Sequence, residues 1–219
     1  MKSYPVIKDR KIKAAIVGCG RISKNHFESI SKHQKNIELV SICDDDESVL
    51  NTHEKKYNIK GYLDLTNMIE KVDLDLVILC TPSGLHAEQT ETCAKKGINI
   101  MTEKPMATRW NDGIRMVKVC DQAGVRLFVV KQNRNNPTIK LIKRAIKENR
   151  FGKIHMVHLN VFWSRPQSYY DQAPWRGTWE FDGGALMNQA SHYIDLLDWL
   201  IGPIDKVQSM ISTTRDIER

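Results

Sequence analysis

The sequence has few cysteines and no long apolar run, and each shortage excludes a class of protein. No stretch approaches the roughly 18 consecutive apolar residues of a membrane-spanning helix, so we expect no membrane segment. The opening residues MKSYPVIKDRKIK lack the apolar core of a secretory signal, which predicts a cytoplasmic protein. The five cysteines form no CxxC pair, so we expect free thiols in a reducing compartment and no thiolate metal site.

The sequence also lacks repeats and low-complexity tracts, and its composition is that of a globular protein. Hydrophobic residues make up 41% and charged residues 27% of the 219 positions, enough to form a core without disulfides. The formal net charge of +7 favours an anionic partner, either a polyanion or a small ligand. Much of the excess lies beside isoleucines at helical spacing: Lys140, Lys143, Arg144, Lys147 and Arg150. Because no aromatic residues are interleaved, this pattern predicts a solvated helix face and no nucleic-acid binding.

Apolar runs alternate with helical segments up to about residue 132. The expected strands are 12–17, 37–43, 76–80, 98–101 and 125–131, and the expected helices are 22–33, 47–57, 86–96 and 111–123. Strands that are apolar throughout, separated by helices, predict a parallel sheet covered on both faces. The fold class is therefore α/β, with a doubly wound Rossmann sheet at the N-terminal end.

The pattern changes after residue 132, where the polar segment QNRNNP forms a connector. A helix to residue 150, strands over 153–163 and 204–213, and a helix over 185–201 are expected beyond it. Two strands make a marginal sheet by themselves. We therefore expect residues 1–132 to form a nucleotide-binding domain and residues 133–219 to be the start of a truncated α/β open-sheet domain.

The turn after the first expected strand carries a chemical motif, GCGRIS, which matches G-x-G-x-x-G except for Ser23. Gly18 would permit the tight turn, and Gly20 would let a pyrophosphate approach the following helix N-terminus. Asp44 ends the next strand, where a carboxylate would accept hydrogen bonds from the adenosine ribose. The acidic cluster of Asp44, Asp45 and Asp46 would repel a 2′-phosphate, so NAD is predicted in preference to NADP. The alternative is a plain strand turn.

Two further strand ends carry polar segments, CTPSGLH and TEKP, at the edge where ligands bind in a parallel sheet. Pro105 biases Lys104 toward an extended conformation, which would aim its amine outward. The alternative is that Glu103 and Lys104 form a solvated loop pair. In the expected helix over 185–201, Asn188 and His192 are four residues apart and share a face. A core histidine with satisfied hydrogen bonds is the alternative there.

Together, GCGRIS, CTPSGLH, EKP and GGALMNQASHYIDLLDWL resemble the Gfo/Idh/MocA family of nicotinamide-dependent sugar oxidoreductases, in the family's order and over essentially the whole chain. The segment FWSRPQSYYDQAPWRGTWEFDGGALMNQASHY looks like the branch that oxidises UDP-N-acetylglucosaminuronic acid at C3 with NAD. That branch serves bacterial surface polysaccharide (O-antigen, lipopolysaccharide) biosynthesis. The resemblance implies a UDP-sugar substrate and a homo-oligomer, a tetramer. The family's acid four residues before the histidine is Asn188 here, which weakens the analogy to the free-polyol dehydrogenases and agrees with the sugar-nucleotide branch.

The resemblance implies that Lys104 and His192 are catalytic, and either could be the general base. We expect a metal-free site with these cofactor contacts: Gly18, Gly20, Arg21, Ile22, Asp44, Thr81, Pro82, His86, Glu103 and Lys104. The expected substrate contacts are Lys104, Arg165, Tyr169, Trp175, Arg176, Asn188, Ser191 and His192. The arginines would hold a uronate or diphosphate, or would be ordinary loop residues. Alternatives are another sugar or polyol dehydrogenase of the family, or a non-catalytic NAD-dependent sugar-binding subunit.

Overall fold

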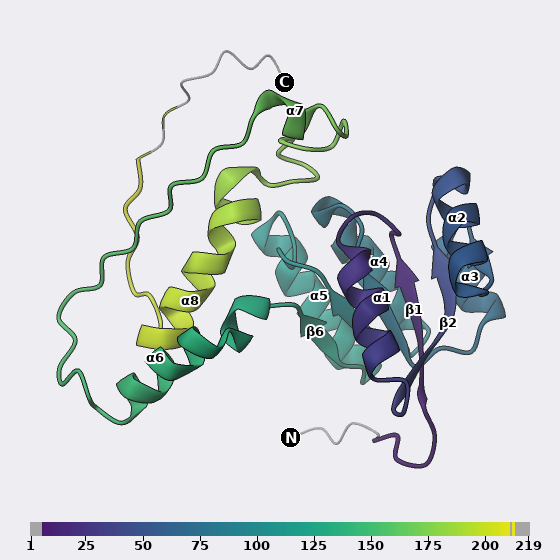
Figure 1. The fold of residues 1–219 in the computed structure, drawn as a ribbon, viewed down its shortest axis with the longest axis horizontal. Coiled ribbons are helices and arrows are strands. Elements are labelled where there is room, and N and C mark those ends of the chain that lie inside the picture. The colour runs from purple at the N-terminus through teal and green to yellow at the C-terminus, as the bar shows by residue number, and fades with distance from the viewer. Residues whose placement is uncertain (1–5, 211, 213–219) are drawn as a thin grey trace.

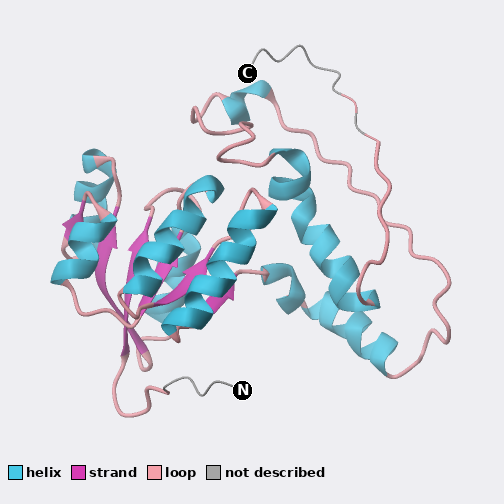
Figure 2. Cartoon of the chain, turned by 180° about the vertical axis from the view of Figure 1, so that it is seen from behind, coloured by secondary structure: helices cyan, strands magenta, loops and turns pink. Residues whose placement is uncertain are grey.

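The computed structural model describes residues 6–210 and 212, and consists of a parallel sheet with helices on both faces followed by a largely helical second part (Figure 1 and Figure 2). The strands are β1 (Ile12–Val17), β2 (Ile37–Cys43), β3 (Gly61–Tyr62), β4 (Leu76–Leu79), β5 (Asn99–Thr102) and β6 (Leu127–Val129). The helices around them are α1 (Ser23–Lys32), α2 (Glu47–Tyr57), α3 (Leu65–Lys71), α4 (His86–Lys95) and α5 (Trp110–Ala123), with the 3-10 turn η1 (Ser83–Leu85). The second part contains η2 (Gln132–Asn135), α6 (Pro137–Lys147), α7 (Gln167–Tyr170), η3 (Leu186–Ala190) and α8 (Ser191–Ile201).

The six strands lie in the order β3-β2-β1-β4-β5-β6, and every pair is parallel. This is the strand order of a doubly wound Rossmann sheet, so the predicted fold class is confirmed. The chain reverses its winding direction between β1 and β4, which pair directly. In such a sheet, ligands bind in the crevice beyond the carboxyl ends of the strands at this switch point.

Alternate side chains of β1 enter two separate cores. Ala14 and Ile16 pack with residues of α1 and α2 on one face, and Ala15 and Val17 pack with residues of α3, α4 and α5 on the other. All four side chains are at most 3% exposed. Burial on both faces explains why the strands are apolar throughout rather than alternating.

The five cysteines are buried free thiols, as expected. Burial raises the pKa of Cys19, Cys43 and Cys93 to about 12, and that of Cys120 to about 11. Their thiols therefore stay protonated at neutral pH.

Asp46 is the N-cap of α2, accepting hydrogen bonds from the Ser48 and Val49 amides, so one acid of the predicted cluster serves the helix.

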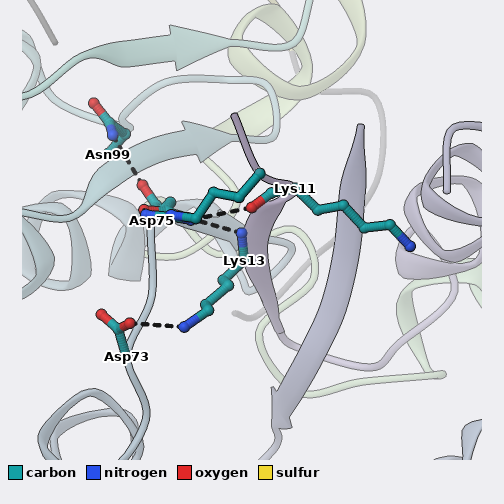
Figure 3. A network of polar contacts seen from close by, with 6 residues as sticks. Lys11, Lys13, Asp73, Asp75 and Asn99 are labelled. Carbon is teal, nitrogen blue, oxygen red and sulfur yellow. Dashed lines mark hydrogen bonds and ion pairs between the residues drawn. The ribbon is translucent and has the colours of Figure 1, made fainter. Parts of the chain in front are cut away.

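The amino ends of the central strands are joined by a polar network (Figure 3). The Asp75 carboxylate accepts a hydrogen bond of 2.7 Å from Arg10 and one of 2.8 Å from the Lys13 amide. The Asp75 carbonyl accepts from the Asn99 side chain at 2.8 Å, and the Lys13 amine reaches Asp73 at 2.8 Å. Because Arg10 donates to it, the pKa of Asp75 is lowered. The network fixes the entry of β1 against β4 and β5, at the edge opposite the strands' carboxyl ends.

The prediction of strands over 153–163 and 204–213 is wrong for the described residues, which form no strand there. Residues 211 and 213 lie outside the described set. A strand needs a hydrogen-bonded neighbour, and within the described chain neither segment has one. Their apolar side chains are largely exposed, among them Met156, Val157, Leu159, Val207 and Met210. The short β3 and α3 were not expected, because two and seven residues give little periodicity.

The second part is docked on the sheet through few but specific contacts. The Gly84 amide donates to the Phe181 carbonyl at 3.2 Å, and the Thr108 hydroxyl donates to the Glu180 carbonyl at 3.1 Å. The loop carrying α7 thereby reaches the end of the molecule toward which β1 points (Figure 1). Within the described residues, none of the helices has the length and apolarity required to cross a bilayer.

Candidate active site

A cleft of about 830 Å³ opens at the carboxyl ends of the strands, between the sheet and the second part. Of the residues expected at the site, these line it: Gly18, Gly20, Arg21, Ile22, Asp44, Thr81, Pro82, Glu103, Lys104, Arg165, Tyr169, Trp175, Arg176, Asn188 and His192. Two expected residues, His86 and Ser191, do not line it. The cleft therefore brings together motifs from both parts of the chain at the switch point of the sheet.

The turn after β1 has the shape that a dinucleotide requires. Gly18 has φ +86°, and a Cβ there would lie 2.8 Å from the carbonyl carbon of Cys80, so a side chain is excluded on steric grounds. At Gly20 a Cβ would meet nothing within 4 Å, so the backbone faces open space in the cleft. Ser23, in the third motif position, is 1% exposed and donates to the Gly20 carbonyl at 2.6 Å. The turn fits a pyrophosphate lying against the N-terminus of α1.

Asp44 lies at the end of β2 with its carboxylate held at two points. One oxygen accepts from the Cys19 amide at 2.6 Å, and the other accepts from the Asp46 amide at 3.0 Å. These contacts fix the carboxylate beside the glycine turn, and Asp44 lines the cleft. A carboxylate fixed there can still accept hydrogen bonds from ribose hydroxyls, because each oxygen has a further lone pair.

Glu103 is not a solvated loop residue. It is 6% exposed, and its carboxylate lies 2.8 Å from Nε2 of His26, a buried residue of α1. Its other oxygen accepts from the Lys104 amide at 3.2 Å. Glu103 therefore connects the helix behind the glycine turn to the backbone that carries Lys104. His26 was not singled out in the sequence, because the two residues are 77 positions apart and no local motif joins them.

The Lys104 amine points across the cleft to the second part. It donates to the backbone carbonyl of Asn188 at 2.7 Å and to the side-chain oxygen of Asn188 at 3.2 Å. Asn188 belongs to η3, a π-helical turn, and not to the regular α-helix expected over 185–201. Such turns are frequent at functional sites because they widen the helix locally. Burial lowers the pKa of Lys104, opposed by the negative charges of Glu103 and Asp182.

His192 is at the start of α8, 9% exposed, and lines the same cleft. Burial lowers its pKa, and the positive charges of Lys104 and Lys131 lower it further. A neutral imidazole at pH 7 can accept a proton. The helix is anchored one turn later, where Asp195 accepts two hydrogen bonds from Arg134, at 2.7 and 2.8 Å. Neither member of this ion pair was identified from the sequence.

The loop before η3 contributes two arginines that stack on aromatic rings. The Arg165 guanidinium lies 5.1 Å from the ring centre of Trp163 and 5.2 Å from that of Tyr169. The Arg176 guanidinium lies 4.4 Å from the Tyr169 ring and 5.6 Å from the Trp175 ring. All five residues line the cleft. Stacking on ring faces holds a guanidinium flat, so that its in-plane donors suit a carboxylate or a phosphate.

His86 lies behind the cleft wall, fully buried, with its two ring nitrogens each 3.0 Å from a carbonyl oxygen, of Pro105 and of Thr81. Burial lowers the pKa of His86, so the neutral ring donates to one of these carbonyls at a time. His86 thus ties the CTPSGLH segment to the EKP segment. Ser191 is also outside the cleft, and within the described residues its buried hydroxyl has no hydrogen-bond partner.

Asp182 is a cleft residue that sequence reasoning missed. It is 2% exposed, accepts from the Gly177 amide at 3.0 Å, and accepts from the side-chain nitrogen of Asn188. Burial raises its pKa, opposed by these hydrogen bonds and by the charges of Lys104 and Arg176. In the sequence, the one available signal for Asp182 is that an acid stands directly before the two glycines that precede η3.

Two family models match the chain: an oxidoreductase family with an NAD-binding Rossmann fold over residues 12–131, and a GFO/IDH/MocA C-terminal domain over residues 139–218. The WlbA dehydrogenase of Chromobacterium violaceum, solved in complex with NADH and UDP-GlcNAcA, superposes with a TM-score of 0.90 at 59% identity, covering 93% of this chain and 59% of that one. The WlbA dehydrogenase of Bordetella pertussis, solved with the same ligands, gives a TM-score of 0.89 at 57% identity, covering 90% and 57%.

Among curated relatives, the D-apiose dehydrogenase of Paraburkholderia graminis is 30% identical over 157 residues, which are 71% of this chain and 40% of that protein. The chain thus spans between 40% and 59% of the length of these three proteins.

Proposed function

The chain belongs to the Gfo/Idh/MocA family of NAD-binding oxidoreductases, and on this premise we propose that the protein oxidises the C3 hydroxyl of UDP-N-acetylglucosaminuronic acid to a ketone, with NAD as acceptor. The observation that carries the proposal is one cleft holding a dinucleotide turn, a lysine–histidine pair and two ring-stacked arginines. Solved relatives at 57% and 59% identity hold NADH and UDP-GlcNAcA. Because the chain spans only part of those proteins, the activity of the whole protein is part of the proposal.

In the proposed complex, Gly18 and Gly20 cradle the pyrophosphate of NAD, and Asp44 accepts hydrogen bonds from its adenosine ribose. A carboxylate already held by two backbone amides cannot turn away from a 2′-phosphate, which it would repel. NAD is therefore favoured over NADP. When bound, NAD supplies a hydride acceptor, and the remaining steps belong to residues of this chain.

Lys104 and His192 divide the acid–base work at C3. As the C3 hydride leaves, the hydroxyl proton passes to the neutral imidazole of His192, and the C3–O bond becomes a carbonyl. The Lys104 amine uses two donors on Asn188, and its third N–H stabilises the developing negative charge on the C3 oxygen. The lowered pKa of His192 supports this assignment over the reverse one, because the base must be unprotonated at the start.

Recognition of the uronate is assigned to Arg165 and Arg176. The proposed substrate carries a diphosphate and a C6 carboxylate, and a stacked guanidinium can bind either through two parallel hydrogen bonds. The ring stacking orders these long side chains before the ligand arrives, which lowers the entropic cost of binding. Tyr169 and Trp175 then form the walls around the sugar.

The proposal extends to assembly and cellular role. We assign residues 133–219 to a substrate and oligomerisation domain, and propose that the protein is a tetramer that serves bacterial surface polysaccharide (O-antigen) biosynthesis in the cytoplasm. Large exposed apolar side chains over 154–163 and 204–210 support a partner surface there. Sedimentation of the full-length protein at micromolar concentration tests this, and a monodisperse monomer would contradict it.

The test of the reaction uses UDP-N-acetylglucosaminuronic acid deuterated at C3. Incubated with NAD and the full-length protein, it should yield reduced cofactor that carries the deuterium. The sugar product should be three mass units lighter than the deuterated substrate, because it loses both the C3 deuterium and the hydroxyl proton. Substrate deuterated at C4 is the matched control and should yield reduced cofactor without deuterium. Reduced cofactor that carries no deuterium from C3, or that carries deuterium from C4, contradicts the assignment.

A further inference from the structure

We propose that Asp182 is a positioning residue of the active site: it orients the Asn188 side chain toward Lys104 and supplies negative charge next to the Lys104 amine. The kinetic part of this inference rests on the proposed function, but the contacts that carry it do not. They form one chain across the cleft, from a buried carboxylate through an amide to an amine.

The first step is the burial of Asp182. Its side chain is in the loop before η3 and is 2% exposed, so its hydrogen bonds must come from the protein. One oxygen accepts from the Gly177 amide at 3.0 Å, and the other accepts from the side-chain nitrogen of Asn188. Burial raises the pKa of Asp182, while these bonds and the nearby positive charges of Lys104 and Arg176 oppose that rise by favouring the ionised carboxylate.

The second step is the orientation of the Asn188 amide. A carboxylate only accepts hydrogen bonds and an ammonium only donates them, so a side-chain amide between the two has one allowed orientation. Its nitrogen faces Asp182, and its oxygen faces the Lys104 amine at 3.2 Å. If residue 182 could donate as well as accept, the amide could turn over and present its nitrogen to Lys104, which would break the contact.

The third step concerns the charge on Lys104. The groups that act on it are Glu103 and Asp182, which are negative, and Lys131 and Arg21, which are positive; His192 is in the same cleft. Glu103 is already engaged by His26 and by the Lys104 backbone. Asp182 is therefore the carboxylate connected to the amine itself, through Asn188. Removal of its charge should make the Lys104 amine lose its proton at lower pH.

The experiment compares the unmodified protein with Asp182→Asn and with the exchange variant Asp182→Asn/Asn188→Asp, which keeps one carboxylate and one amide but swaps their places. Glu180→Gln is the matched control, because it removes an exposed carboxylate from the same loop. The pKa of Lys104 is measured from the pH dependence of amine acetylation, followed by mass spectrometry of the peptide that contains it. This readout does not require activity.

We expect Asp182→Asn to lower the pKa of Lys104 by about one unit, the usual scale for loss of one close charge. The exchange variant should restore most of that shift, and Glu180→Gln should cause none. In kinetics, Asp182→Asn should lower kcat more than it raises KM, with the pH limb that belongs to Lys104 moved to lower pH. A residue with only a structural role would leave this pH limb where it is.

An unchanged Lys104 pKa in a folded Asp182→Asn variant overturns the inference, as does an exchange variant no better than the single one. Should Asp182→Asn fail to fold, Asp182→Ser removes the same charge with a smaller side chain, and an unchanged Lys104 pKa in that variant overturns the inference equally. If the unmodified protein does not oxidise UDP-N-acetylglucosaminuronic acid, the proposed function fails, while the acetylation result still decides the role of Asp182.

Discussion

The two glycines of the β1 turn should respond to alanine in opposite ways. Gly18 has φ +86°, and an added Cβ would lie 2.8–2.9 Å from three backbone atoms of Cys80 and Thr81. Gly20 has no such φ, and its added Cβ would meet nothing within 4 Å. Gly18→Ala therefore damages the protein itself, whereas Gly20→Ala fills only the space in which we place the pyrophosphate.

For Gly18→Ala, the left-handed backbone costs about 1–2 kcal/mol with a Cβ present. Displacing the end of β4 adds roughly 1–3 kcal/mol, as other overpacked sites do. A loss of about 2 kcal/mol or more should lower Tm by at least about 4 °C for a chain of this length. Gly20→Ala should leave Tm within about 1 °C. Its NAD affinity should fall about tenfold or more, which corresponds to about 1.4 kcal/mol.

Thermal unfolding followed by circular dichroism and NAD titration by calorimetry measure both effects on the same samples. An unfolding temperature of Gly18→Ala equal to that of the unmodified protein would contradict the steric requirement for glycine at position 18. The placement of the pyrophosphate is refuted if Gly20→Ala binds NAD with unchanged affinity. Loss of stability in Gly20→Ala would show that the open space beside it is not open in solution.

Three further outcomes follow from the same geometry. Asp44→Ser should narrow the preference for NAD over NADP, measured as the ratio of the two dissociation constants, and an unmodified protein that binds both equally contradicts the ribose assignment. Lys104→Ala and His192→Ala should each lower turnover about a hundredfold or more with little change in NAD affinity, and near-normal turnover in either removes the role given to it. Asp75→Asn should lower the free energy of unfolding at pH 7, more than the exposed control Asp73→Asn does. Arg10 lowers the pKa of Asp75 in the folded state. The stabilisation from the ionised carboxylate is therefore fully present above the unfolded-state pKa of about 3.9 and is lost as the pH falls through the lower folded-state pKa. The free energies of unfolding of the variant and of the unmodified protein should therefore converge in acid.

Local signals in the sequence predict the nucleotide end well. The glycine turn, the β2 run and Asp44 are each contiguous, and a strand that is buried on both faces must be apolar throughout. The second part is harder to predict, because a strand needs a hydrogen-bonded neighbour and apolar composition alone does not show whether one is present. Residues 153–163 are apolar and β-branched enough for a strand, yet no described segment pairs with them.

The site residues that sequence reasoning missed share a different cause. Asp182 is buried by a loop without periodicity, and His26 is recognisable only through Glu103, which is 77 residues away. Arg134 and Asp195 look like ordinary surface charges until the chain folds and places them 2.7 Å apart. Sequence motifs reveal residues that lie close together along the chain. Residues whose partners are far away in the sequence are recognised only in the folded structure.

The proposed function requires that the protein be selective for a sugar nucleotide with a C6 carboxylate, held by a guanidinium in the cleft. The most direct measurement is steady-state NADH formation by the full-length protein with UDP-N-acetylglucosaminuronic acid, UDP-N-acetylglucosamine, free inositol and free glucose. We expect clear turnover of the first compound, little of the second and none of the other two. A site built for a polar group rejects analogues without it by a factor on the order of 10⁴ in favourable cases. Arg165→Ala should reduce both the rate and the preference, whereas the exposed Arg150→Ala should change neither. Comparable rates with the uronate and the neutral sugar would contradict the claim.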